Sequence, residues 1–246
     1  MKDKDLVLHG KVENGTIRLG DKLALMPSGA PAQVLGLLDG QDRKVKFALP
    51  GENIQIKINV SDEEAVKRGD VLCQREAKMP VTHVLEVELD ILDLLEYKPI
   101  ISRGYICVMH IHTASDDIII SELIRSEETG EKGELIVKQR PKFARSHTRL
   151  ICRLESKNPL ALEKFEHIQQ MGRFTLRDEG RTICVGKVLK YKPLSKWIEG
   201  KDSPDVPEAQ PVVVTVNEGN HFVYNLETGE TRNQAPPLAE ISEEAD

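Results

Sequence analysis

Short apolar stretches separated by turns are the feature that most restricts what this chain can fold into. Ile54 to Ile58 alternates strictly between apolar and polar side chains, which is typical of a strand with one buried face. Glu13-Asn14-Gly15 and Pro50-Gly51-Glu52-Asn53 carry the residues that favour tight turns. Such turns recur about every 8–12 residues along the chain, a spacing typical of barrels and sandwiches. We therefore expect an all-β protein.

The pattern divides the chain into three parts. Residues 1–76 and 77–193 each contain enough short strands for one β-barrel, so we predict two tandem barrels. Residues 194–246 read as an acidic linker, a hairpin and a disordered end. In that hairpin, Val212 to Val216 would pair with His221 to Leu226. The stretch from Phe222 onward resembles the second half of a WW domain, although Asn233 stands where that family has a tryptophan.

Composition excludes several classes of protein. The 246 residues carry a net charge of −6, but residues 194–246 hold 11 acidic and 3 basic side chains while the remainder has a net charge of +2. This balance argues against a dedicated nucleic-acid-binding protein. No apolar run approaches the roughly 18 residues of a membrane span, and the charged N-terminus lacks the apolar stretch of a signal peptide. The four cysteines form no Cys-x-x-Cys pair, so we expect buried, reduced thiols in a cytoplasmic protein.

Motifs for catalysis or metal binding are weak. His110 and His112 are spaced to share one strand face, but the spacing fixes no third ligand. We interpret them as packed, hydrogen-bonded histidines and expect no metal site. The Gly-x-x-x-x-Gly-Lys-Ser/Thr loop that cradles phosphates does not occur, and Gly130-Glu131-Lys132-Gly133 lacks its spacing. We expect no catalytic residues and no nucleotide cofactor in this chain.

The stretch from Gly172 to Val188 is the best candidate for a binding surface. Two short strands flank the turn Asp178-Glu179-Gly180, in which Gly180 can adopt a positive φ. Arginine and aromatic side chains dominate the energetics of protein interfaces, so the first strand predicts a contact patch, with Phe174 or Leu176 as the anchor. A solvated hairpin over a barrel core is the alternative. The predicted partner-binding residues are Arg173, Phe174, Leu176, Arg177 and Asp178.

The same stretch resembles the last hairpin of the eukaryotic class II peptide chain release factors, which are elongation-factor-like translation GTPases. The matching motifs in the first part are Gly10-Lys11-Val12, Gly20-Asp21-Lys22-Leu23, Met26-Pro27 and Pro50-Gly51-Glu52-Asn53. Those in the second part are Gly104-Tyr105, His110-Ile111-His112-Thr113 and Arg140-Pro141-Lys142-Phe143. The start departs from the family, which has a glycine where this chain has Lys4-Asp5.

The resemblance implies that residues 1–76 and 77–193 are domains 2 and 3 of such a factor, without its GTPase domain. It further implies a role in translation termination, in which domain 3 holds the class I release factor that reads stop codons. The parent GTPase, with its GTP and magnesium in the absent domain, would deliver that factor to the ribosome. No membrane and no specific nucleic acid are expected as partners. The alternative is a ribosome-rescue GTPase that carries a pelota-type partner.

Overall fold

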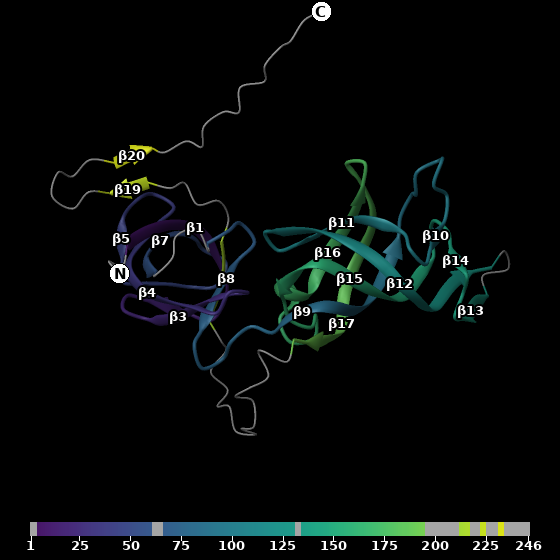
Figure 1. Cartoon of the computed structure of the whole chain (residues 1–246), viewed down its shortest axis with the longest axis horizontal. Helices are drawn as coiled ribbons and strands as arrows, with labels where there is room; N and C mark the ends of the chain where they lie inside the picture. Colours follow the sequence, from purple (N-terminus) through teal and green to yellow (C-terminus); the bar gives the residue numbers. More distant parts are fainter. Residues whose placement is uncertain are drawn as a thin grey trace, which may run out of the picture.

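A computed structural model of the chain describes residues 4–60, 66–130, 134–194, 212–216, 222–224 and 231–233. Two closed β-barrels follow one another along most of the chain (Figure 1). This confirms the predicted all-β architecture of tandem barrels. The expected linker, Ser195 to Gln210, and the expected disordered end, Glu240 to Asp246, lie outside the described residues.

Six strands close the first barrel through the pairing of β3 with β4. Around the barrel they run in the order β3 (Lys22–Met26), β8 (Val71–Gln74), β18 (Val213–Val216), β1 (Lys4–Asn14), β7 (Asn53–Val60) and β4 (Ala30–Asp39). The core is aliphatic because alternate side chains of each strand point inward, as β7 shows: Ile54, Ile56 and Ile58 are buried. Shorter strands lie outside the ring, namely β2 (Ile17–Arg18), β5 (Lys44–Val45) and β6 (Phe47–Ala48).

The second barrel is also a ring of six strands, closed by the pairing of β11 with β12. Its order is β11 (Ile106–Ile111), β16 (Arg173–Asp178), β17 (Arg181–Pro193), β9 (Val81–Ile91), β15 (Arg149–Ala161) and β12 (Ala114–Thr129). Strand β13 (Leu135–Gln139) extends the sheet beyond β12, and a single helical turn, α1 (Gln169–Gly172), leads into β16. The remaining strands, β10 (Ile101–Ser102) and β14 (Phe143–Ala144), pair with each other.

The predicted hairpin of Val212–Val216 with His221–Leu226 is wrong. Strand β18 instead lies between β1 and β8, antiparallel to both, and is a wall of the first barrel. Strand β19 (Phe222–Tyr224) pairs with β20 (Thr231–Asn233). Residues 1–76 therefore do not close the first barrel by themselves, because β1 and β8 each need β18 to complete their backbone hydrogen bonds.

A separate apolar cluster joins the two barrels. Met26 and Cys73 of the first barrel, Met171 of α1 and Val213 of β18 are all fully buried in it. Gly69, with φ of 93°, lets the two barrels approach each other closely beside this cluster. A Cβ atom at this position would lie 2.7 Å from the Cα atom of Ala114 in the second barrel. The barrels thus share a packed junction.

Candidate protein-binding face of the second barrel

The β16–β17 hairpin forms as its sequence predicts, with a turn at Glu179 (φ 47°) and Gly180 (φ 77°). Positive φ at both central turn residues gives the hairpin a backbone twist that matches its strands. The alternation along β16 places Phe174 and Leu176 in the barrel core, where Phe174 is only 4% exposed. Gly186 of β17 makes room for the Phe174 ring, because a Cβ there would lie 2.4 Å from the ring's Cζ.

This burial corrects the predicted contact patch. Phe174 and Leu176 cannot anchor in a partner's pocket while the barrel is folded, because both side chains fill its interior. Arg173 and Arg177 point to the opposite face and are exposed, and Asp178 is half-buried. The structure therefore separates the five predicted residues: Phe174 and Leu176 fill the barrel, Arg173 and Arg177 lie on its outer face, and Asp178 lies half-buried at the hairpin tip.

Two apolar residues on that outer face were not predicted. Ile106 of β11 is 61% exposed and Val185 of β17 is 43% exposed. The strand register places Val185 opposite Thr175, and Val108, two residues along β11 from Ile106, opposite Arg177. Ile106 stands in the uninterrupted apolar run Ile106-Cys107-Val108-Met109, so periodicity alone did not show which side faces out. We call Ile106, Arg173, Thr175, Arg177 and Val185 the outer face of the second barrel.

Asp178 fixes the tip of the hairpin to the neighbouring loop. Its Oδ2 atom accepts hydrogen bonds from Lys98 Nζ at 2.9 Å and from the Tyr105 hydroxyl at 2.8 Å. Burial works to raise the pKa of the Asp178 carboxyl, but the hydrogen bonds from Lys98 and Tyr105 outweigh it, and the pKa lies below its usual value. Asp178 therefore orients the hairpin as an ionised carboxylate.

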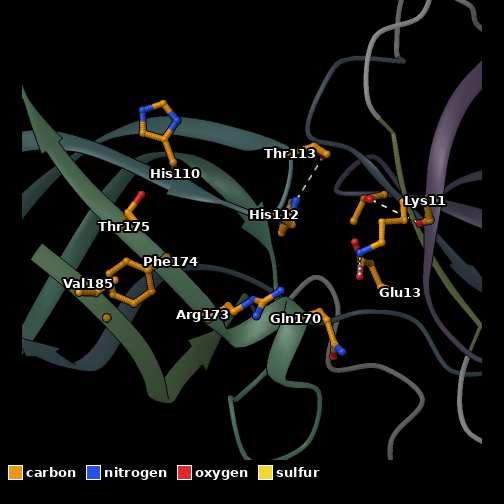
Figure 2. A pocket seen from close by; sticks show the side chains of 12 residues that line it. Lys11, Glu13, His110, His112, Thr113, Gln170, Arg173, Phe174, Thr175 and Val185 are labelled. Carbon is orange, nitrogen blue, oxygen red and sulfur yellow. Dashed lines mark hydrogen bonds and ion pairs between the residues drawn. The ribbon is translucent and has the colours of Figure 1, made fainter. Parts of the chain in front are cut away.

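A cleft of about 430 Å³ lies between the outer face and the first barrel (Figure 2). Lys11 and Glu13 of β1 enter it from one side and form an ion pair at 3.2 Å. His112 and Arg173 enter from the second barrel. The cleft brings charged and hydrogen-bonding groups of both barrels together, next to the exposed part of β16.

The two histidines belong to this region but take different positions. His112 sits at the β11–β12 turn with φ of 40°, and its Nε2 atom lies 3.0 Å from the Ala161 carbonyl oxygen. Burial lowers the pKa of His112 to about 4, so the ring is neutral at pH 7. His110 lies on the strand, where burial and then Arg177 and Arg68 lower its pKa. Among the described residues, no three His, Cys, Asp or Glu side chains gather as a metal site would require.

The four cysteines are buried and unpaired, as predicted. Burial raises the pKa of the Cys73 thiol to about 11, which keeps the thiol protonated at pH 7. In the part of the chain that the structure describes, no helix is both long and apolar enough to cross a membrane.

Comparisons with known proteins agree with this architecture. Residues 6–73 match the family model of elongation factor Tu domain 2, and residues 86–189 match that of the GTP-eEF1A C-terminal domain-like family. The fold is also similar to the solved structures of sup35 complexed with GDP and with GMPPNP. Each has a TM-score of 0.67 and 30% sequence identity, covering 78% of this chain and 48% of the other. The chain thus contains the paired barrels of the elongation-factor-type translation GTPases.

Curated relatives narrow this class. Over 190 residues, or 77% of this chain, the sequence is 36% identical to the eukaryotic peptide chain release factor GTP-binding subunit of Kluyveromyces lactis, 37% to that of Candida maltosa and 35% to that of Schizosaccharomyces pombe. In its two barrels, the chain is homologous to the eukaryotic peptide chain release factor GTP-binding subunits. It spans about a quarter of the length of these relatives, between 26% and 28%.

Proposed function

We propose that the chain acts in translation termination as the module that holds a class I release factor. The observation that carries this proposal is that the relationship to release factor subunits covers the second barrel, whose outer face combines exposed cationic and apolar groups. A protein interface needs an apolar anchor, which loses its bound water on association. It also needs charged groups, which set how the two surfaces align. Ile106 and Val185 supply the first requirement, and Arg173 and Arg177 supply the second.

The chemistry of the outer face indicates what kind of partner surface it fits. Both exposed arginines can form paired hydrogen bonds with carboxylates, so the partner should present acidic side chains around an apolar patch. Asp178 holds the hairpin tip rigid through Lys98 and Tyr105, which reduces the ordering cost of binding. Delivery of the bound factor to the ribosome would depend on a GTPase domain elsewhere in a longer protein.

Titration calorimetry with a purified class I release factor tests the proposal, with a pelota-type protein titrated in parallel. We expect binding of the release factor and at least tenfold weaker binding by Ile106→Ser, because an exposed apolar anchor is removed. Leu135→Ser is the matched control: Leu135 is 64% exposed, close to the 61% of Ile106, but lies on β13, away from the outer face. Its affinity should stay within about twofold of the parent.

Two results would overturn this assignment. Equal losses for Ile106→Ser and Leu135→Ser would show that the outer face has no special role. Binding of the pelota-type protein alone would move the function to ribosome rescue.

We also propose that this chain binds no guanine nucleotide by itself, because its sequence contains no phosphate-binding loop. A fluorescent GTP analogue titrated into the chain with magnesium should give no saturable signal. Saturable binding that unlabelled GTP displaces would contradict this expectation.

A further inference from the structure

The first barrel is completed by a strand from a distant part of the chain. Strand β18 comes after the whole second barrel, yet it pairs with β1 on one side and with β8 on the other. Val216 N donates to the Asp70 carbonyl at 3.0 Å, and Gly69 N donates to the Val216 carbonyl at 3.3 Å. If β18 left, both neighbours would expose a row of unpaired backbone groups, which is a ready template for another strand.

The groove between β1 and β8 is shaped for a strand of this composition. Val212, Val214 and Val216 fill the core of the first barrel, whereas Val213 packs into the cluster that joins the two barrels. All of them are buried, with at most 2% of the side chain exposed. Thr215, on the same face as Val213, is 1% exposed, so the groove encloses both faces of the strand.

Gly10 of β1 shows how closely the strand fits. A Cβ atom at this position would lie 2.5 Å from the Thr215 carbonyl oxygen and 3.0 Å from Val214 Cγ1. Any larger side chain at position 10 would exclude a strand from the groove without altering β18. The groove can thus be blocked independently of the strand that fills it.

Strand β18 is attached to the second barrel by residues 195–211. Leu194 is held at the start of this connection by its N–H, which donates to the Val81 carbonyl at 2.9 Å. The connection has 17 residues, and a fully extended chain of that length spans at most about 60 Å. The strand and the groove are identical in every copy, so an exchanged strand makes the same hydrogen bonds and the same apolar contacts.

We propose that the groove between β1 and β8 is a strand-acceptor site that takes β18 from a second copy of the chain, forming a strand-exchanged dimer. Within one molecule the tether gives β18 a local concentration in the millimolar range. Exchange therefore requires a high protein concentration and a temporary opening of the first barrel. The dimer, once formed, should persist after dilution, because each strand is locked between two neighbours.

Cys73 provides a built-in probe, because the strand register places it opposite Val213. Both side chains lie in the cluster between the barrels, so Val213→Cys puts two thiols on facing strands. The donor chain carries Val213→Cys together with Cys73→Ser, and the acceptor is the unaltered chain with a distinguishable tag. Only exchange of β18 brings the donor thiol to the Cys73 of the acceptor.

The two full-length chains are mixed at high concentration, warmed to just below the unfolding midpoint, cooled and treated with diamide. We expect a disulfide-linked heterodimer on a non-reducing gel. A matched donor carrying Val214→Cys and Cys73→Ser should give none, because Val214 faces the barrel core. Gly10→Val in the acceptor should also abolish the heterodimer, since the groove is then blocked.

A single Val213→Cys variant that retains Cys73 should form the bond within one molecule when dilute. If it does so but the mixed chains never crosslink, β18 does not exchange and the proposal is wrong. If this variant does not form the intramolecular bond, β18 does not lie in the groove beside Cys73, and the proposal is wrong as well. A heterodimer that forms equally well with the Val214→Cys donor would show unspecific crosslinking and would also contradict it.

Discussion

At the residue scale, the position of each side chain along β16 decides whether it stabilises the barrel or is available to a partner. Phe174 is buried against Leu89 and Gly186, so Phe174→Ala should lower the free energy of unfolding by about 3–5 kcal/mol. Arg177 is exposed, and Arg177→Ala should change the free energy of unfolding by no more than about 0.5 kcal/mol. Urea denaturation of both variants measures the difference. Similar values for the two would mean that β16 is not placed as described.

Asp70 gives the molecule a pH dependence of known sign. Burial raises the pKa of its carboxyl to about 6, only partly offset by the hydrogen bond from the Lys67 backbone N–H. The folded state therefore holds a proton that the unfolded state releases near pH 4. The stability that this proton contributes is present below about pH 4 and is lost as the pH rises through about 6. Asp70→Asn should be more stable than the parent at pH 7 by about 1–2 kcal/mol, allowing for solvent screening.

Urea denaturation of the parent and of Asp70→Asn at pH 4 and pH 7 tests this. The advantage of the variant should shrink toward pH 4, where the parent carboxyl is protonated. An advantage of the same size at both pH values would show that Asp70 does not titrate in this window.

At the scale of elements, the β16–β17 hairpin depends on the ionised carboxylate of Asp178. The pKa of this group is lowered by Lys98 and Tyr105 against the effect of burial, so its stabilisation is present at neutral pH and is lost as the pH falls below about 4. Asp178→Asn should reduce the free energy of unfolding at pH 7 by about 1 kcal/mol, a modest value because Lys98 is partly exposed.

A double-mutant cycle with Lys98→Met assigns this loss to the ion pair. If the pair acts as described, Asp178→Asn should cost less in the Lys98→Met background. Strictly additive losses would show that Asp178 and Lys98 do not act together.

The strands themselves differ in how much of their role could be read from the sequence. The turn at Gly180 and the alternation of β16 were predictable because both depend on residues close together in the chain. The location of β18 was not, because a strand's composition does not identify its partner. The four apolar residues among Val212–Val216 did signal burial on both faces, which suits a barrel wall better than a terminal hairpin. Alternation likewise gave β16 two faces but did not show which one faced the core.

At the scale of the whole molecule, the junction between the barrels should make them unfold together. Met171 is fully buried in the cluster that joins them, and Val213 on β18 connects that cluster to the core of the first barrel. Met171→Ala should therefore do more than lower stability by about 2–5 kcal/mol. It should also separate the unfolding of the two barrels, because their shared contacts are weakened.

Calorimetry distinguishes these two effects through the ratio of the van't Hoff to the calorimetric enthalpy, which is one for a single cooperative transition. Leu150→Ala is the matched control: Leu150 is equally buried but lies only in the core of the second barrel. Both variants should melt at lower temperature, and only Met171→Ala should reduce the ratio below that of the parent. A reduced ratio in both would place the coupling inside the second barrel. An unchanged ratio in Met171→Ala would mean that β18 alone is enough to couple the barrels, because its faces contact the first core and the junction at once.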